Sequence, residues 1–180
     1  SDVCSSDLEN MAAADLEALG GFQRNVGSLQ RSVIAAISSA SDARSRIGMY
    51  RRSAQEAPVD NAKLVADAER LDDEIEEILN ELRGGRESTD IPPPSINDRV
   101  GYVAGRIRLS STRPTKTQLE QYDLVNGEFQ AVLTRLRKLI DVDMPALEKA
   151  LDAAGAPLVQ GQVPGGRSAE EEDGGDGGGI

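Results

Sequence analysis

The chain has 180 residues, and its 31 Asp and Glu against 20 Lys and Arg give a formal net charge of −11. It contains no His and a single Cys, which excludes catalysis through a His-containing triad, most zinc sites and an internal disulfide. The acidic balance argues against a nucleic-acid surface, and no apolar run approaches the ~20 residues of a membrane span. We therefore expect neither a nucleic-acid partner nor a membrane-spanning segment.

The first eight residues, Ser1 to Leu8, match the translation of a common sequencing adapter. The alternative is an ordinary polar N-terminus in which Ser5 or Asp7 caps a helix. We expect residues 1–8 to be an artefact that contains the only cysteine, Cys4. On this interpretation the chain is an N-terminally truncated, metagenomic fragment, and the truncation hides any signal peptide.

The opposite end, residues 161–180, is rich in Gly and acidic residues and almost free of apolar groups. Such a composition cannot bury enough surface to offset the entropy of ordering, so we predict a disordered tail. Residues 9–160 remain as one domain. Breaks are expected at Pro58, from Gly84 to Ser95 with its triple proline, and from Ser110 to Pro114.

Between these breaks the apolar residues recur at helical steps of three and four. In the first long segment the phase is expected to slip after Ala40, toward Ile47 and Tyr50. The predicted stripes are Phe22, Val26, Leu29, Val33, Ile37 and Ala40; Leu64, Ala68, Leu71, Ile75, Ile78 and Leu82; Ile96, Val100, Val103 and Ile107; and Leu119, Tyr122, Asn126, Phe129, Leu133, Leu136 and Ile140.

Asn126 is a polar residue within the last of these stripes. It could fix helix register from a buried position, or its neighbour Val125 could turn inward in its place, and the pattern leaves both open.

Residues that favour helix ends occur at the segment boundaries. Asp60 or Asn61 is expected to cap the second helix and Gly84 to end it in a left-handed conformation. Thr115 and Gln118 have the spacing of a capping box. Asp143 before Pro145 suggests a new start, with a short fifth helix over residues 145–154 that ends at Gly155. The sequence therefore predicts an all-α fold: an antiparallel bundle of about four main helices plus a short C-terminal helix.

Candidate chemistry is sparse. The carboxylates of Asp72, Asp73, Glu74, Glu76 and Glu77 fall opposite the apolar stripe and indicate a solvated helix face rather than an acid–base pair. A di-metal bundle site would need inward Glu and His, whereas the inward positions here are aliphatic. We therefore expect no catalytic, cofactor-binding or metal-binding residue in this chain.

Two basic clusters and a glycine pair have structural interpretations. The clusters, near the ends of their helices, favour interaction with the helix dipole and acidic neighbours over nucleic-acid binding. Gly101 and Gly105 form a small-xxx-small pair that predicts close helix packing. The clusters are Arg44, Arg46, Arg51 and Arg52, and Arg135, Arg137 and Lys138.

Several short motifs occur along the second half of the chain. They are the prolines at 92–94, the segment INDRVGYVAG at 96–105, Arg113-Pro114-Thr115, Pro145-Ala146-Leu147 and Ala156-Pro157-Leu158. Together they resemble the C-terminal helical region of bacterial sortilin-like proteins. Proteins of this kind carry a β-propeller of bacterial-neuraminidase-type repeats and are often described as glycosyl hydrolase-like. Helical segments at 33–52 and 64–82 resemble the part that precedes these motifs.

The resemblance implies a non-catalytic structural or interaction module at the C-terminus of an exported, extracytoplasmic or secreted protein. Its partner would be the β-propeller of the same parent chain, which this sequence lacks, or another protein or a second copy. Alternatives are an accessory domain of a secreted glycosyl hydrolase-like enzyme and a free-standing coiled-coil adapter. Whether the parent is a hydrolase stays open, but this fragment is not expected to be an enzyme.

Overall fold

A computed structural model describes residues 13–85, 94–110 and 112–157, and these are all-α, as predicted. The predicted artefact at residues 1–8, the acidic tail at 161–180 and most of the proline-rich break lie outside the described residues. The elements are α1 (Ala13–Gln55), α2 (Asn61–Arg83), α3 (Ile96–Arg108), α4 (Lys116–Lys138), the π-helical turn η1 (Leu139–Asp143) and α5 (Met144–Ala153).

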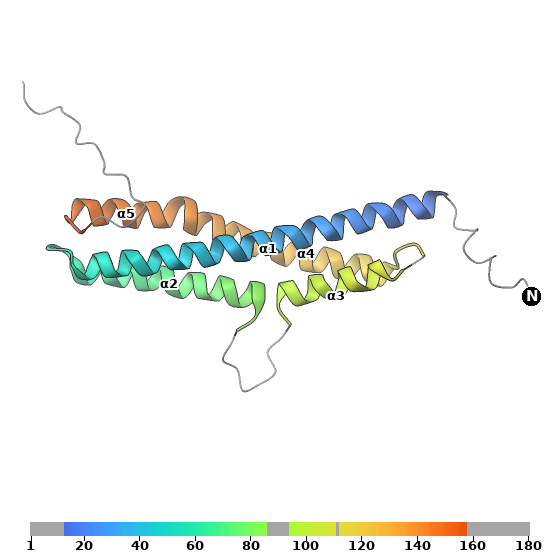
Figure 1. The fold of residues 1–180 in the computed structure, drawn as a ribbon, viewed down its shortest axis with the longest axis horizontal. Coiled ribbons are helices and arrows are strands. Elements are labelled where there is room, and N and C mark those ends of the chain that lie inside the picture. The colour runs from blue at the N-terminus through green and yellow to red at the C-terminus, as the bar shows by residue number, and fades with distance from the viewer. Residues whose placement is uncertain (1–12, 86–93, 111, 158–180) are drawn as a thin grey trace, which may run out of the picture.

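The helices form three long rods, and each rod runs antiparallel to the one before it in the chain (Figure 1). The first rod is α1 alone, whose 43 residues span about 64 Å at 1.5 Å per residue. The second rod consists of α2 and α3, which lie end to end with a break between them. The third rod runs through α4, η1 and α5 without a loop. In cross-section the bundle therefore contains three helices, because α2 and α3, which were predicted as separate main helices, share one rod.

The apolar stripe of α1 alternates steps of three and four along its whole length, so the predicted phase slip is wrong. Ala36 is buried in place of Ile37, and Ala43 then links Ala40 to Ile47 without a change of phase. Alanine gives a weak signal for a buried position because its side chain has little apolar area, which is why Ala36 and Ala43 do not stand out in the sequence. The stripe consists of Leu19, Phe22, Val26, Leu29, Val33, Ala36, Ala40, Ala43, Ile47, Tyr50 and Ala54.

The stripes predicted for the second rod are confirmed. All six predicted residues of α2 and all four of α3 are buried. Their steps match those of α1, and a stripe with a period near 3.5 keeps its face toward neighbouring helices in a bundle.

Part of the buried stripe of α4 lies one residue away from the predicted positions. Val125 is buried at 1% exposure while Asn126 is half-buried, so the open alternative is resolved in favour of valine. Leu119, expected in the core, is 43% exposed. The buried positions of α4 are Val125, Phe129, Val132 and Leu136, and Leu139 continues them at the start of η1.

The predicted short fifth helix is present as α5, but it continues the third rod through η1 and does not begin with a cap at Asp143. Asp143 makes no side-chain cap, and the N–H of Met144 instead bonds the carbonyl of Leu139, five residues earlier. Pro145 has no N–H and its ring crowds the carbonyl four residues before it, so a wider π turn suits this position. The helix does end where predicted, with Gly155 at a φ of 67°.

The remaining helix ends agree with the sequence only in part. The capping box of Thr115 and Gln118 is confirmed. Asp60 precedes α2 but makes no side-chain cap, and its φ of 54° lies in the left-handed region. Gly84 has the expected positive φ of 85°, although its ψ of 149° is not left-handed helical.

Buried apolar residues fall into two clusters. The larger joins α1, α2, α4, η1 and α5 through the middle and one end of the bundle, and it includes Ile96 and Val100 from the first half of α3. The smaller, at the end formed by α3 and the start of α1, is thin and receives only the half-buried Tyr122 from α4. It consists of Leu19, Phe22, Val26, Val103 and Ile107.

Candidate functional site

A groove opens between α3 and α4, beside the break in the second rod. It has two adjoining hollows of about 520 and 440 Å³ that share Pro94 and Arg99. We call the two hollows together the α3–α4 groove. The larger hollow is lined by Pro94, Asp98, Arg99, Tyr102, Val103, Gln121 and Leu124.

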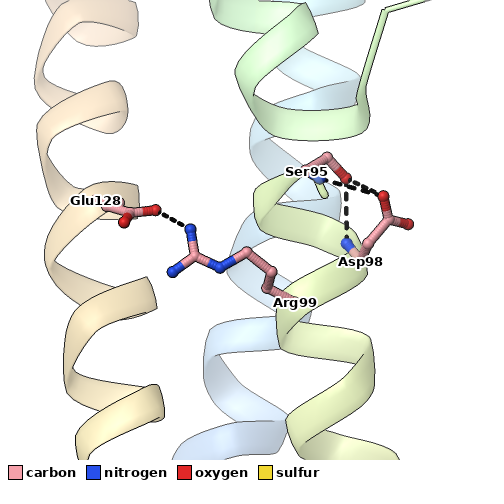
Figure 2. Close-up of polar contacts among 4 residues, drawn as sticks. All are labelled: Ser95, Asp98, Arg99 and Glu128. Carbon is pink, nitrogen blue, oxygen red and sulfur yellow. Dashed lines mark hydrogen bonds and ion pairs between the residues drawn. The ribbon is translucent and has the colours of Figure 1, made fainter. Parts of the chain in front are cut away.

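The start of α3 is held by a capping box at one end of this groove (Figure 2). Ser95 Oγ accepts a hydrogen bond from the Asp98 N–H at 3.2 Å, and Asp98 Oδ2 accepts bonds from the Ser95 N–H and Oγ. Because both side chains are engaged with each other, the Asp98 carboxylate serves to begin the helix after the break.

One ion pair crosses the groove. The Arg99 guanidinium reaches from α3 to the Glu128 carboxylate on α4, and Figure 2 shows it between the two helices. The two side chains are 29% and 43% exposed, so solvent screens the pair and its contribution to stability is small. It bridges the two helices at this level.

Beyond the ion pair the groove is apolar and open. Val103 is buried at its base, whereas Tyr102 and Leu124 are 55% and 60% exposed. The Arg106 guanidinium donates to the Tyr102 hydroxyl at 3.0 and 3.1 Å and lies 5.2 Å from the centre of its ring. Tyr102 is therefore positioned by its own helix while its ring stays accessible.

The sequence did not single out this groove. Tyr102 and Leu124 carry the only signal: they are large apolar residues that lie off the predicted stripes of their helices. A single residue of that kind is common on surfaces, and the closeness of these two follows only from the antiparallel packing of α3 on α4.

The acidic face of α2 is solvent-facing, and several of its carboxylates pair with cations on the other rods. Asp72 and Glu76 lie 3.5 and 3.3 Å from the Arg44 guanidinium of α1. Glu77 and Glu81 lie 3.1 and 2.5 Å from that of Arg135 on α4.

The predicted basic clusters are divided among such pairs. In addition to Arg44 and Arg135, Arg46 lies 3.7 Å from Glu148 and Lys138 2.6 Å from Asp143. Arg52 lies in the last turn of α1, as the dipole interpretation predicts.

The close packing predicted for Gly101 and Gly105 is not made within the described part of the chain. Both are exposed, and a Cβ added to either would meet no atom within 4 Å. Gly127 on α4 is exposed in the same way. Packing among the described residues gives no reason for glycine at these helical positions.

A buried polar contact that the sequence also missed joins α1 to α5. Tyr50, 1% exposed, accepts a hydrogen bond from Arg46 at 2.8 Å and donates one to Glu148 at 3.2 Å. Burial, with the Glu148 carboxylate adding to it and Arg46 opposing it, raises the pKa of the Tyr50 phenol above its usual 10.0.

Within the described residues there is no group of three or more Asp, Glu or Cys that could hold a metal ion. No helix among them is long and apolar enough to cross a bilayer. Comparison with family models, with curated proteins and with solved structures gives no match to this chain.

Proposed function

We propose that this chain is a non-catalytic helical module that acts as a spacer and an interaction surface. The observation that carries the proposal is the apolar stripe of α1, which runs unbroken from Leu19 to Ala54 and packs on the other two rods. A sequence that repeats one packing unit over this length builds a stiff, elongated body rather than an enclosed pocket.

The sequence resemblance extends the proposal to the parent protein. On that basis the module forms the C-terminal part of an exported, sortilin-like β-propeller protein and packs beside the propeller or mediates its association. Recovery of the full-length gene tests this directly. Propeller repeats with aspartate boxes upstream of residue 9 are expected, and an upstream frame without them contradicts the assignment.

The non-catalytic role is tested on the 180-residue chain itself. We expect no hydrolysis of aryl glycosides by the purified protein. Hydrolysis that a single carboxylate substitution abolishes, for instance Glu128→Gln beside the α3–α4 groove, would show that the module is itself an enzyme.

A further inference from the structure

The two helices that border the α3–α4 groove share an arrangement. Each contributes one large exposed apolar side chain to the lining of the groove, Tyr102 on α3 and Leu124 on α4. Each also has an exposed glycine three residues later, Gly105 and Gly127, and residues three apart lie on the same face of a helix.

Glycine is unfavourable in the interior of a helix relative to alanine, and here nothing in the described chain needs the missing Cβ. A glycine beside a large apolar residue instead suits the close approach of a helix from another molecule. Because α3 and α4 both carry this arrangement, the two sides of the groove are suited to pack on each other across a two-fold axis.

The charges of the two helices are opposite. On α3 the residues Arg99, Arg106 and Arg108 outnumber Asp98. On the first half of α4 the carboxylates of Glu120 and Asp123 outnumber Lys116. An arrangement that places α3 of one copy on α4 of another is therefore attractive, and one that places α3 on α3 brings like charges together.

Of the two possible two-fold axes, only one places α3 of one copy on α4 of the other. An axis perpendicular to the helices places each helix on its own copy. An axis parallel to the helices, along the groove, places α3 of each copy opposite α4 of the other copy. It also places Tyr102 of one copy opposite Leu124 of the other, since the two residues line the same part of the groove.

The same axis continues the pattern along the rest of the molecule. It places α2, whose carboxylates are in excess, opposite the basic last turn of α4 in the second copy. Arg135 already pairs with Glu77 and Glu81 of α2 within one chain. The charge pattern that joins the second and third rods within a copy can therefore also join them between copies.

We propose that the α3–α4 groove is a self-association surface at which two copies of this chain form a parallel, two-fold symmetric dimer. The inference rests on the proposed interaction role and names its partner. Tyr102 and Leu124 form the apolar centre of the interface, Gly105 and Gly127 permit the close approach, and Arg106 and Glu120 lie at its charged edge.

The first experiment compares two substitutions of matched exposure by sedimentation equilibrium over a range of concentrations. Leu124, 60% exposed, and Ile34, 56% exposed on α1, are each replaced by Asp. Leu124→Asp buries an unpaired charge in the interface, so we expect the dimer dissociation constant to rise about tenfold or more, and Ile34→Asp to leave it unchanged. Salt of about 0.15 M screens the repulsion between two acidic chains beyond roughly 8 Å.

A second pair of variants separates folding from association. Gly105→Leu adds a side chain where the single copy leaves space, so the variant keeps its helicity by circular dichroism and loses the dimer. Gly48→Leu, on α1 and equally free of contacts within 4 Å, is the control and keeps both.

Cross-linking then distinguishes the two axes in a Cys4→Ser background. A mixture of chains carrying Tyr102→Cys with chains carrying Leu124→Cys is expected to give a disulfide-linked heterodimer, whereas neither variant alone cross-links efficiently. A monomer at every concentration overturns the proposal and leaves the groove to a different chain. A dimer that Leu124→Asp does not weaken, or cross-links of Tyr102→Cys chains among themselves, overturns it as well. None of these outcomes depends on glycoside hydrolysis, so the inference and the non-catalytic role fail separately.

Discussion

Tyr50 shows how a single side chain can serve both the core and the surface of the bundle. Its ring continues the apolar stripe of α1 at 1% exposure, and its hydroxyl contacts Arg46 and Glu148. The contact joins the C-terminal part of α1 to α5, the last described helix. The periodicity predicted the position of the ring, but the partner of the hydroxyl, 98 residues away on α5, depends on tertiary packing.

The substitution Tyr50→Phe removes this hydroxyl. We expect it to lower the free energy of unfolding by about 1 kcal/mol near pH 8, because one hydrogen-bonded group is lost while its partners, Arg46 and Glu148, remain partly solvated. The difference in the free energy of unfolding between the wild-type protein and Tyr50→Phe depends on pH. Because the folded-state pKa of Tyr50 is raised, its stabilising contribution is complete below the unfolded pKa and is lost as the pH rises through the folded value.

Urea unfolding of both proteins at several values between about pH 8 and pH 11 measures this effect. The wild-type protein should lose stability faster than Tyr50→Phe above the usual phenol pKa of 10.0. The exposed Tyr102 and the half-buried Tyr122 are present in both proteins, so any contribution from them cancels in the comparison. A difference that stays constant across the range would contradict the role assigned to burial.

At the scale of the element, the register of α4 shows where periodicity reaches its limit. Val125 and Asn126 are adjacent, so a helix stripe can be drawn through either one with steps of three and four. The stripe through Asn126 also includes Leu133 and Ile140, which are half-buried in the structure. The choice depends on how the helix is rotated against α1 and α2, and this rotation is a property of the packed bundle.

A pair of substitutions tests the register. Val125→Asn removes a buried aliphatic side chain and buries an amide, and we expect it to lower the free energy of unfolding by about 2 to 4 kcal/mol. Asn126→Val at the neighbouring half-buried site should change it by less than about 0.5 kcal/mol. Chemical denaturation of the two variants gives both values, and the reverse order would mean that Asn126 faces the core.

The π turn η1 solves a related problem in the third rod. The buried residues proceed by steps of three and four as far as Leu139, and the next buried residue, Met144, comes five residues later. The extra residue would rotate α5 away from the core if the helix stayed α-helical. The wider turn absorbs it, and Leu147 and Leu151 remain buried.

Deletion of Val142, which is 58% exposed, restores a step of four between Leu139 and Met144. It also places Pro145 inside a regular α-helix, so the deletion alone should lower the free energy of unfolding by about 3 kcal/mol. When Pro145→Ala is added, the stability should return to the wild-type value or exceed it, as measured by thermal or urea unfolding. Failure of the second change to rescue the first would show that η1 has a role besides accommodating the extra residue.

At the scale of the whole molecule, the all-α class, the stripes of α2 and α3 and the breaks between helices could be predicted from the sequence. They depend on local periodicity and on residues such as Pro58 and Gly84 that interrupt helices. The number of rods could not be predicted in the same way. A loop between α2 and α3 allows either a reversal or a straight continuation, and only the lengths of the neighbouring rods favour the continuation.

The candidate site was beyond prediction for the same reason. Its two apolar residues, Tyr102 and Leu124, come from different rods, and the sequence does not show that they meet. The unpartnered state of Gly105 is also a property of the assembled bundle, since the sequence alone suggested a packed glycine.

The three-rod arrangement makes the two ends of the molecule unequal. The end built from the second half of α3, the start of α1 and the start of α4 depends on the five-residue cluster. The half-buried Tyr122 packs against this cluster, and its ring meets that of Phe22 edge to face with centroids 5.5 Å apart. The rest of the bundle contains the larger cluster. A helix of 13 residues with few buried side chains opens more readily than one of 23 in a denser core.

Native-state hydrogen exchange should therefore show the amides of α3 exchanging at least about tenfold faster than those of α2. The buried positions compared are Val103 in α3 and Ile75 in α2, which both face the core. Measurement at the lowest workable protein concentration keeps self-association from protecting α3. Adding small amounts of urea should leave the α3 rates nearly unchanged while those of α2 rise, because opening α3 exposes less surface than unfolding the bundle. Equal rates and equal urea dependence in the two helices would mean that the bundle opens as one unit, and the break in the second rod would then have no effect on its cooperativity.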